Sequence, residues 1–382
     1  MITSLRIAHF KAAADVTVPL GPITVLIGPN DSGKSTILQA LVALSRAADK
    51  ARLGPEQILA CPLAVAPTNL EASTDIGIFA EGSTSLGPKQ QQRYRYDFAI
   101  SARYKAIVRE RVEWDGKKLV ELGPRMGSTL TSQIFENRGW PYPHTILSGL
   151  VGDPSLLGTT TIGPQFEAIG NDLGATLLRL DSRAIAKPSA LGAPLLDDGS
   201  GLVGIVDEIL TSGVGDDKIA RTNEALRRIT PHVKTLAAKY HAPSGGKELH
   251  FALRSGAVIP ASQMSDGVVL AAALVMISLG VGTRRLLIEE PENGLHPRQV
   301  GIIADTLRSI ATEYGTQVVL TTHSPLLLNH FGAEETLLVT RTEAGVSVKP
   351  MSKAQGFDEL ATEMSLGELW YNVGDSDLAR PA

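Results

Sequence analysis

The residues from Gly28 to Ser35 are of the types that hold phosphate groups. The run Gly-Pro-Asn-Asp-Ser-Gly-Lys-Ser matches the pattern G-x-x-x-x-G-K-[ST], in which glycines let successive backbone N–H groups face an anion. We expect the ammonium group of Lys34 to reach the β- and γ-phosphates of ATP, and the hydroxyl group of Ser35 to ligate Mg²⁺. The whole segment is predicted to bind the nucleotide: Gly28, Pro29, Asn30, Asp31, Ser32, Gly33, Lys34, Ser35 and Thr36.

Two adjacent acids, Glu289 and Glu290, end the apolar run Leu286–Ile288. Burying a carboxylate is costly unless it is paired or binds a metal. We therefore predict that Glu289 holds Mg²⁺, while the catalytic residue Glu290 orients or deprotonates the attacking water. The alternative is a strand that ends at solvent, with both carboxylates hydrated.

Further positions in the last third of the sequence suit a phosphate site. Ser265 and Gly267 begin the apolar stretch Val268–Leu279, and a helix N-terminus there favours an anion, although Ser265 is equally suited to capping the helix. His323 ends the buried run QVVLTTHS and is predicted to sense the γ-phosphate as a second catalytic residue; a lone histidine is more often structural. For His296, which precedes Pro297 at a predicted helix start, both interpretations stay open.

The predicted elements place these residues where strands meet helices. Met1–Phe10 and Ile23–Ile27 have strand patterns, alternating runs around the turn Asp115–Lys117 indicate antiparallel strands, and residues 201–240 have helical spacing. Alternating strands and helices in the last third indicate a mostly parallel α/β sheet. We predict an α/β fold with four parts: a nucleotide-binding core (1–72 and 255–345), an antiparallel β-subdomain (73–124), a mainly helical insertion (125–254) and a C-terminal tail (346–382).

Composition narrows the classes of protein. The net charge of −4 argues against a surface coated with positive charge for DNA binding. The single cysteine, Cys61, excludes an intrachain disulfide and fits a cytoplasmic setting. The apolar run Val268–Gly282 is shorter than the roughly 20 residues that span a bilayer, and we expect no membrane contact.

In their order along the chain, the motifs NDSGKST, SDG, LLIEEPENGLHP and TTHSP resemble ABC-type P-loop ATPases of the RecF/SMC/OLD branch, especially its small AAA-labelled members. The opening LRIAHFKAAADV is also similar, with Phe10-Lys11 where Phe-Arg is common. The resemblance covers residues 1–45 and 255–330. It implies a homodimer that sandwiches ATP, with Lys34, Ser35, Glu289 and Glu290 of one subunit facing Ser265 and Gly267 of the other. It also implies a role in DNA repair or anti-phage defence.

Three features depart from the resemblance. Glu289 stands where many ABC proteins have Asp. Met264 and Asp266 alter the ABC signature motif, which is usually LSGG and is MSDG in this chain. The tail from residue 346 is too short for the Toprim domain of OLD-type nucleases. No glutamine is clearly placed for the Q-loop, with Gln133 and Gln165 as candidates.

The leading functional prediction is an ATP-hydrolysing switch whose state is read by a separately encoded effector, a nuclease or a toxin. The alternatives are the ATPase subunit of a membrane transporter and a non-hydrolysing ATP sensor. The long separation of Lys34 and Ser265 argues against the transporter, and the presence of Glu290 and His323 argues against the sensor. Nucleic-acid contact stays open: basic and aromatic residues alternate over Arg93–Arg111, a pattern that a solvated hairpin face also produces.

Overall fold

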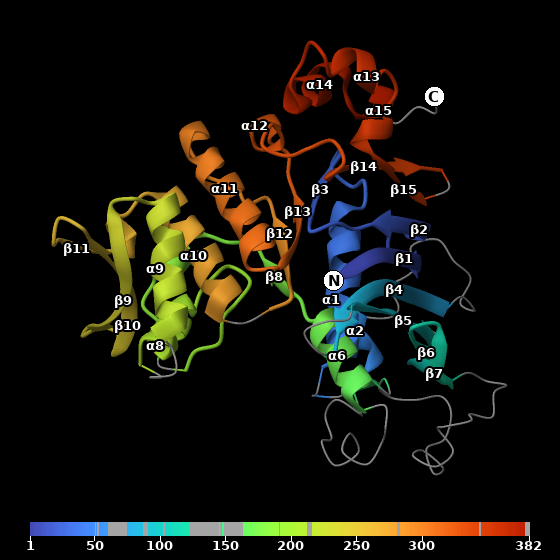
Figure 1. Ribbon diagram of the computed structural model, residues 1–382, viewed down its shortest axis with the longest axis horizontal. Helices are drawn as coiled ribbons and strands as arrows, with labels where there is room; N and C mark the ends of the chain where they lie inside the picture. The colour runs from blue at the N-terminus through green and yellow to red at the C-terminus, as the bar shows by residue number, and fades with distance from the viewer. Residues whose placement is uncertain are drawn as a thin grey trace.

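The computed structural model describes residues 1–49, 51, 53–59, 75–86, 91–101, 104–122, 145, 147–148, 163–190, 192–211, 216–280, 283–343 and 345–378. Across these ranges the strands form two six-stranded sheets and one three-stranded sheet, with helices packed between and beside them (Figure 1). This arrangement confirms the predicted α/β class.

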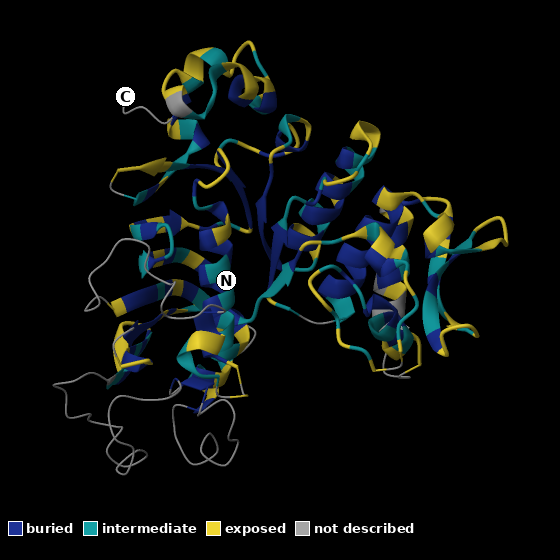
Figure 2. Ribbon diagram, turned by 180° about the vertical axis from the view of Figure 1, so that it is seen from behind, coloured by how far each residue is buried: buried dark blue, intermediate teal, exposed yellow. Residues whose placement is uncertain are grey.

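The central sheet has the order β15-β14-β3-β13-β12-β8 and is parallel except for β15. Its middle strands are apolar along their length because both faces are covered, and they appear as the buried centre of Figure 2. The strands are β3 (Ile23–Ile27), β8 (Thr176–Leu178), β12 (Arg285–Glu289), β13 (Gln317–Thr321), β14 (Thr336–Thr342) and β15 (Gly345–Pro350).

Neighbouring residues of these strands serve two different cores. Leu26 faces the core that contains helix α1 (Lys34–Ala47), whereas Val25 faces the core that contains α10 (Asp266–Gly280) and α11 (Pro297–Glu313). This alternation is the two-residue period of a strand. Helix α10 is buried almost throughout, which explains why it is apolar on all sides.

An antiparallel sheet with the order β2-β1-β4-β5-β6-β7 lies on the other side of α1. The antiparallel strands predicted for residues 73–124 are present, but the predicted boundary at residue 73 does not follow the sheets. Leu5 of β1 pairs with Ala80 of β4, so the N-terminal strands extend this sheet. Its members are β1 (Ile2–Phe10), β2 (Ala13–Pro19), β4 (Asp75–Ser85), β5 (Gln91–Ser101), β6 (Ala106–Trp114) and β7 (Lys117–Leu122).

The insertion before α10 is less helical than predicted. Helix α9 (Asp216–Ile229) ends just before Thr230-Pro231, because proline disfavours a helical conformation in the preceding residue. The segment β9 (Val233–His241), predicted as helix, is a strand that pairs with β10 (Gly246–Leu253), which in turn pairs with β11 (Val258–Pro260). This small sheet, α9 and α8 (Leu202–Thr211) pack around α10.

Short helices complete the described chain. Part of the predicted tail, β15, belongs to the central sheet, and the helices after it lie near α12 beyond the carboxyl edge of that sheet (Figure 1). None of the helices in the described ranges is long and apolar enough to cross a membrane. The remaining elements are α2 (Pro55–Leu59), α6 (Gly163–Leu173), α7 (Ser182–Ile185), α12 (Pro325–Leu328), α13 (Phe357–Leu360), α14 (Leu366–Val373), α15 (Asp375–Leu378) and the 3₁₀ turns η1 (Ala261–Gln263) and η2 (Met351–Lys353).

Candidate functional site

Strand register brings the predicted site residues to one edge of the central sheet. Glu289 of β12 lies opposite Thr321 of β13, and Thr321 lies opposite Leu26 of β3. These parallel strands end at the same edge, where ligands of open α/β sheets bind. The loop after β3, the acids of β12 and the histidine after β13 are therefore neighbours (Figure 1).

The loop between β3 and α1 depends on two glycines in backbone conformations that other residues seldom adopt. Gly28 has φ 138°, and a Cβ atom there would lie 2.0 Å from the carbonyl oxygen of Val339. Gly33 has φ 107° at the N-cap of α1. Asp31 also has positive φ, at 61°. The chain thus turns sharply twice, as a loop wrapped around an anion requires.

Unsatisfied donors converge on this loop. Among the described residues, nothing accepts from the backbone N–H groups of Lys34, Ser35 and Thr36, the first turn of α1. The hydroxyl group of Ser32 is buried without a hydrogen-bond partner in the same ranges. Together with the positive end of the helix dipole, these groups are donors of the kind that bind a phosphate.

Lys34 lies along the inside of the loop. Its Nζ donates to the carbonyl oxygens of Gly28 and Pro29, each at 2.8 Å. Burial lowers the pKa of Lys34, and the negative charges of Asp375, Glu290 and Asp31 oppose that shift. The ammonium group is therefore already inside the anion site.

The two acids after Ile288 have different surroundings. Both carboxylate oxygens of Glu289 accept from the guanidinium group of Arg179, at 2.6 and 3.1 Å. Glu290 has positive φ, at 47°, a strained conformation that is common at functional sites. Its backbone N–H donates to Thr321, and its carboxylate accepts from Nδ2 of Asn293 at 2.7 Å.

A third acid, Glu292, connects the segment after β12 to Thr322 and His323, which follow β13. Its Oε1 accepts from the hydroxyl group of Thr322 at 2.6 Å and from the backbone N–H of His323 at 3.1 Å. Burial raises the pKa of Glu292, and these hydrogen bonds oppose the shift. Nε2 of His323 lies 3.8 Å from Oε1 of Glu290. Glu292 therefore holds the histidine beside the predicted catalytic carboxylate.

The start of α10 is exposed at Ser265 and buried at Gly267. The carbonyl oxygen of Ser265 accepts from Val268 and Val269, but its hydroxyl group makes no hydrogen bond to any other described residue. The expected side-chain cap is thus not formed. A Cβ atom on Gly267 would lie 2.8 Å from Gln299 of α11, so the glycine permits close packing of the two helices.

Comparison with known families identifies the chain. The family described as "AAA domain, putative AbiEii toxin, Type IV TA system" matches residues 23–329. The chain belongs to this AAA-domain family. The match includes the P-loop, both acids and the histidine, and it agrees with the predicted P-loop ATPase of the RecF/SMC/OLD branch.

Individual relatives support the same fold. The AAA-domain chain is 44% identical over 41 residues to an OLD nuclease of Thermus scotoductus, a stretch that covers 11% of this chain and 8% of the nuclease. An Smc head bound to the C-winged helix domain of ScpA is similar with a TM-score of 0.55 and 14% identity, covering 91% of this chain and 97% of the other. For an Smc head bound to the C-terminal domain of ScpA from Pyrococcus furiosus, the TM-score is 0.52 at 13% identity, with 95% and 99% covered.

Of the two Q-loop candidates, the structure describes only Gln165. Gln133 lies outside the described residues. Gln165 belongs to α6. The backbone N–H of Ala175, two residues after that helix, donates to the hydroxyl group of Ser45 in the last turn of α1, the end opposite the P-loop (Figure 1). Where β8 ends beside β12, Arg179 contacts Glu289. Sequence reasoning missed Arg179 because the three-residue strand before it is too short for a periodic signal.

The structure also places His296, for which two interpretations were open, and Glu292, which the sequence predictions did not include. Nδ1 of His296 accepts from the backbone N–H of Arg298 at 3.2 Å as part of a capping box at the start of α11. This contact supports the structural interpretation of that residue. Glu292 is not predicted from the sequence as a site residue. The signal for it is a third acid only three positions after Glu289.

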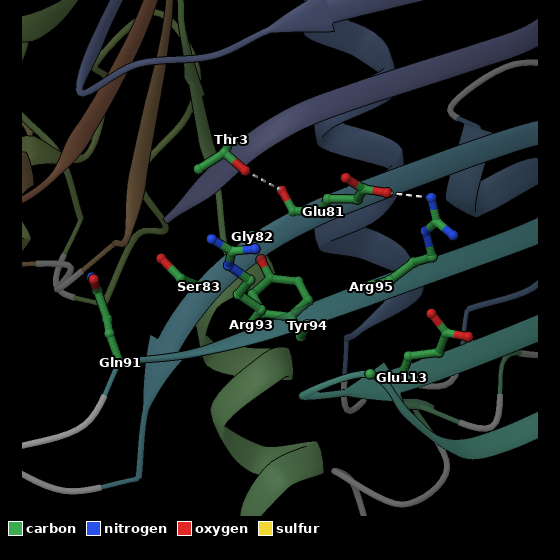
Figure 3. Close-up of a pocket in the computed structure, with 10 residues that line it drawn as sticks. Thr3, Glu81, Gly82, Ser83, Gln91, Arg93, Tyr94, Arg95 and Glu113 are labelled. Carbon is green, nitrogen blue, oxygen red and sulfur yellow. Dashed lines mark hydrogen bonds and ion pairs between the residues drawn. The ribbon is translucent and has the colours of Figure 1, made fainter.

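The predicted basic run lies on the antiparallel sheet of the AAA domain. Arg93–Arg111 covers β5 and β6, whose strands pair directly. There Arg95 forms an ion pair with Glu81, and Arg109 lies 3.6 Å from Asp97, whose pKa burial raises. A hollow of about 710 Å³ beside this face (Figure 3) is lined by Thr3, Glu81, Gly82, Ser83, Gln91, Arg93, Tyr94, Arg95, Glu113 and Gly116. Paired charges favour a solvated sheet face, and nucleic-acid contact stays open.

Proposed function

We propose that this chain binds ATP with Mg²⁺, hydrolyses the γ-phosphate bond and works as an ATP-driven homodimeric switch. The observation that carries the proposal is the meeting of Lys34, Glu290 and His323 at one sheet edge, beside the unsatisfied donors of α1. Lys34 and the N–H groups would bind the phosphates, as in other P-loop NTPases.

The residues at this edge fit a magnesium ion. The hydroxyl-bearing Ser35 is exposed in the first turn of α1, and the carboxylate of Glu289 is a hard oxygen ligand of the kind that Mg²⁺ prefers. Within the described ranges, no three His, Cys, Asp or Glu side chains are gathered to hold a metal by themselves. Mg²⁺ would therefore take its other ligands from phosphate and water, and would neutralise charge on the phosphate oxygens.

Glu290 is the proposed general base. Its carboxylate is fixed on one side by Asn293 and faces His323 on the other, so it can accept a proton from an attacking water. His323 would hold the γ-phosphate end of the site. The fixed positions of both groups support hydrolysis over a sensor that only binds ATP.

Dimerisation is proposed from the start of α10. Ser265 is exposed with a hydroxyl group that has no hydrogen-bond partner among the described residues, and the N-terminus of this 15-residue helix carries a positive dipole end. A second copy would present Ser265 to the γ-phosphate bound by the first. The biological role, in DNA repair or anti-phage defence with a separately encoded nuclease or toxin as effector, is supported by the short likeness to the OLD nuclease.

The proposal is tested by Glu290→Gln, which keeps the shape of the side chain and removes the base. This variant should bind ATP·Mg²⁺ but lose at least about 99% of its hydrolysis, since general-base catalysis contributes roughly 10²–10⁴-fold. The trapped ATP should hold the dimer closed, which mass measurement in solution would detect. Glu343→Gln, at an exposed glutamate, is the control. Wild-type turnover in Glu290→Gln would contradict the proposed base.

A further inference from the structure

Arg179 is placed where it can control the predicted metal ligand. It follows β8, the neighbour of β12 in the central sheet, and both of its contacts are to one carboxylate. Nε donates to Oε2 of Glu289 at 2.6 Å, and Nη2 donates to Oε1 at 3.1 Å. A guanidinium fork that engages both oxygens is the strongest geometry for such a pair.

This pair and a metal ion compete for the same carboxylate. While Arg179 is in place, both oxygens of Glu289 accept hydrogen bonds and its negative charge is matched by a positive one. A divalent cation arriving there meets a neutralised ligand and a nearby like charge. Glu289 can therefore act as a metal ligand of full charge only after the guanidinium group turns away.

The arginine side of the pair is open to an arriving ligand. The Arg179 side chain is 47% exposed, whereas the Glu289 side chain is 18% exposed. A guanidinium fork matches a phosphate as well as it matches a carboxylate. An incoming triphosphate thus supplies a replacement partner next to the metal end of the site, whereas a diphosphate lacks the terminal group.

We propose that Arg179 exchanges partners, binding Glu289 in the empty or ADP-bound site and the terminal phosphate of a nucleoside triphosphate when Mg²⁺ reaches Glu289. Arg179 is then a specificity-determining residue that makes the site distinguish ATP from ADP. This inference rests on the proposed function, because it requires that ATP·Mg²⁺ binds at this edge. A purely structural Arg179 would instead affect both nucleotides alike.

The test measures the affinities of a non-hydrolysable ATP analogue and of ADP, each with Mg²⁺, for the wild type and for Arg179→Ala. In the variant, the analogue should bind about tenfold more weakly, because a charge-assisted contact is lost. ADP should bind equally or more tightly, because Glu289 is free for the metal. Arg179→Lys keeps the charge without the fork and should also lose discrimination. Arg183→Ala, at a neighbouring exposed arginine, should change neither affinity.

The outcomes separate the inference from the proposed function. If the wild type binds neither nucleotide, the proposed function and the inference both fail. If the wild type binds both nucleotides and their affinity ratio is the same in Arg179→Ala, the inference alone fails. Thermal unfolding of the nucleotide-free proteins shows whether each variant is folded. Should Arg179→Ala be unfolded, Arg179→Lys decides, and an unchanged ratio in that variant overturns the inference.

Discussion

Two hydrogen bonds of Lys34 hold the P-loop in shape. Its ammonium group is bound by two carbonyl oxygens of its own loop, which offset part of the cost of burying a charge. Phosphate oxygens would replace these carbonyls with a stronger, charge-assisted contact. The loop is thus arranged for an anion before one binds, which reduces the ordering cost of binding.

Lys34→Ala should abolish tight ATP binding. The dissociation constant for ATP should rise at least about tenfold, because the phosphates lose the one lysine of the loop. The measurement is direct titration with ATP·Mg²⁺. Lys239→Ala, which removes an exposed lysine of β9, is the control and should bind normally. Unchanged affinity in Lys34→Ala would remove the P-loop assignment of this segment.

Glu292 should make stability depend on pH. Because burial raises its pKa above the ordinary value of 4.5, the folded chain binds this proton more readily than the unfolded chain. The resulting stabilisation is complete below pH 4.5 and is lost as the pH rises through the folded-state pKa. Glu292→Gln cannot ionise, so its melting temperature relative to the wild type should increase as the pH rises from about 4.5 to 7.

An opposite control is available in the same chain. The hydroxyl group and backbone N–H of Ser365 lower the pKa of Glu368, so the stability that this carboxylate contributes is present above its ordinary pKa and is lost as the pH falls. Glu368→Gln should therefore lose melting temperature relative to the wild type as the pH rises. A difference between Glu292→Gln and the wild type that is constant with pH would contradict the burial argument.

At the scale of elements, substitutions of Ser265 at the start of α10 separate two roles, which are capping this helix and facing the γ-phosphate bound by a partner. Since its hydroxyl group makes no hydrogen bond to any other described residue, Ser265→Ala should change the free energy of unfolding by no more than about 0.5 kcal/mol. Ser265→Asp should also fold, because a carboxylate complements the helix dipole. If the residue faces a partner's γ-phosphate, the aspartate opposes an anion in a closed interface, which costs several kcal/mol.

The expected result for Ser265→Asp is therefore a folded chain that binds ATP through its own Lys34 but neither dimerises with ATP nor hydrolyses it. Thermal unfolding, nucleotide titration and mass in solution measure the three properties. Normal hydrolysis by a normally stable Ser265→Asp protein would leave no role for this residue in a composite site.

The elements that the sequence predicts well are those with long, consistent patterns. Buried runs predict β3, β12 and β13, and periodic spacing predicts α1 and α11, because these elements are covered on defined faces. The helical interpretation of β9 is wrong because its half-exposed residues follow neither period clearly. Pairing of β1 with β4 depends on contacts across more than 70 residues of chain, which local patterns do not encode. The ion pair of Arg179 and Glu289 also joins residues that are 110 positions apart, so local patterns do not encode it.

At the scale of the whole molecule, the proposed composite site would draw on two regions of the chain. The P-loop and the acids lie where the central sheet ends, and Ser265 begins a helix enclosed by α8, α9 and α11. Among the described residues, α10 shares a buried core with β3, β12 and β13. The hydroxyl group of Ser182, three residues after Arg179, also donates to Asp266 in the first turn of α10 at 2.5 Å.

A mixture of two inactive variants tests the symmetric dimer that this division implies. In a two-fold sandwich, each site uses the P-loop of one subunit and the start of α10 of the other. A dimer of one Lys34→Ala and one Ser265→Asp subunit carries both defects in the same site, and its second site is intact. Random pairing would make half of the dimers mixed, so about a quarter of the wild-type sites should recover. ATPase activity after mixing equal amounts measures this recovery, with each variant alone as the control. Two conditions must be met first: the Ser265→Asp chain binds nucleotide through its intact P-loop, and the two variants exchange subunits. If the mixture is then no more active than the separate variants, Ser265 does not complete the site of a partner.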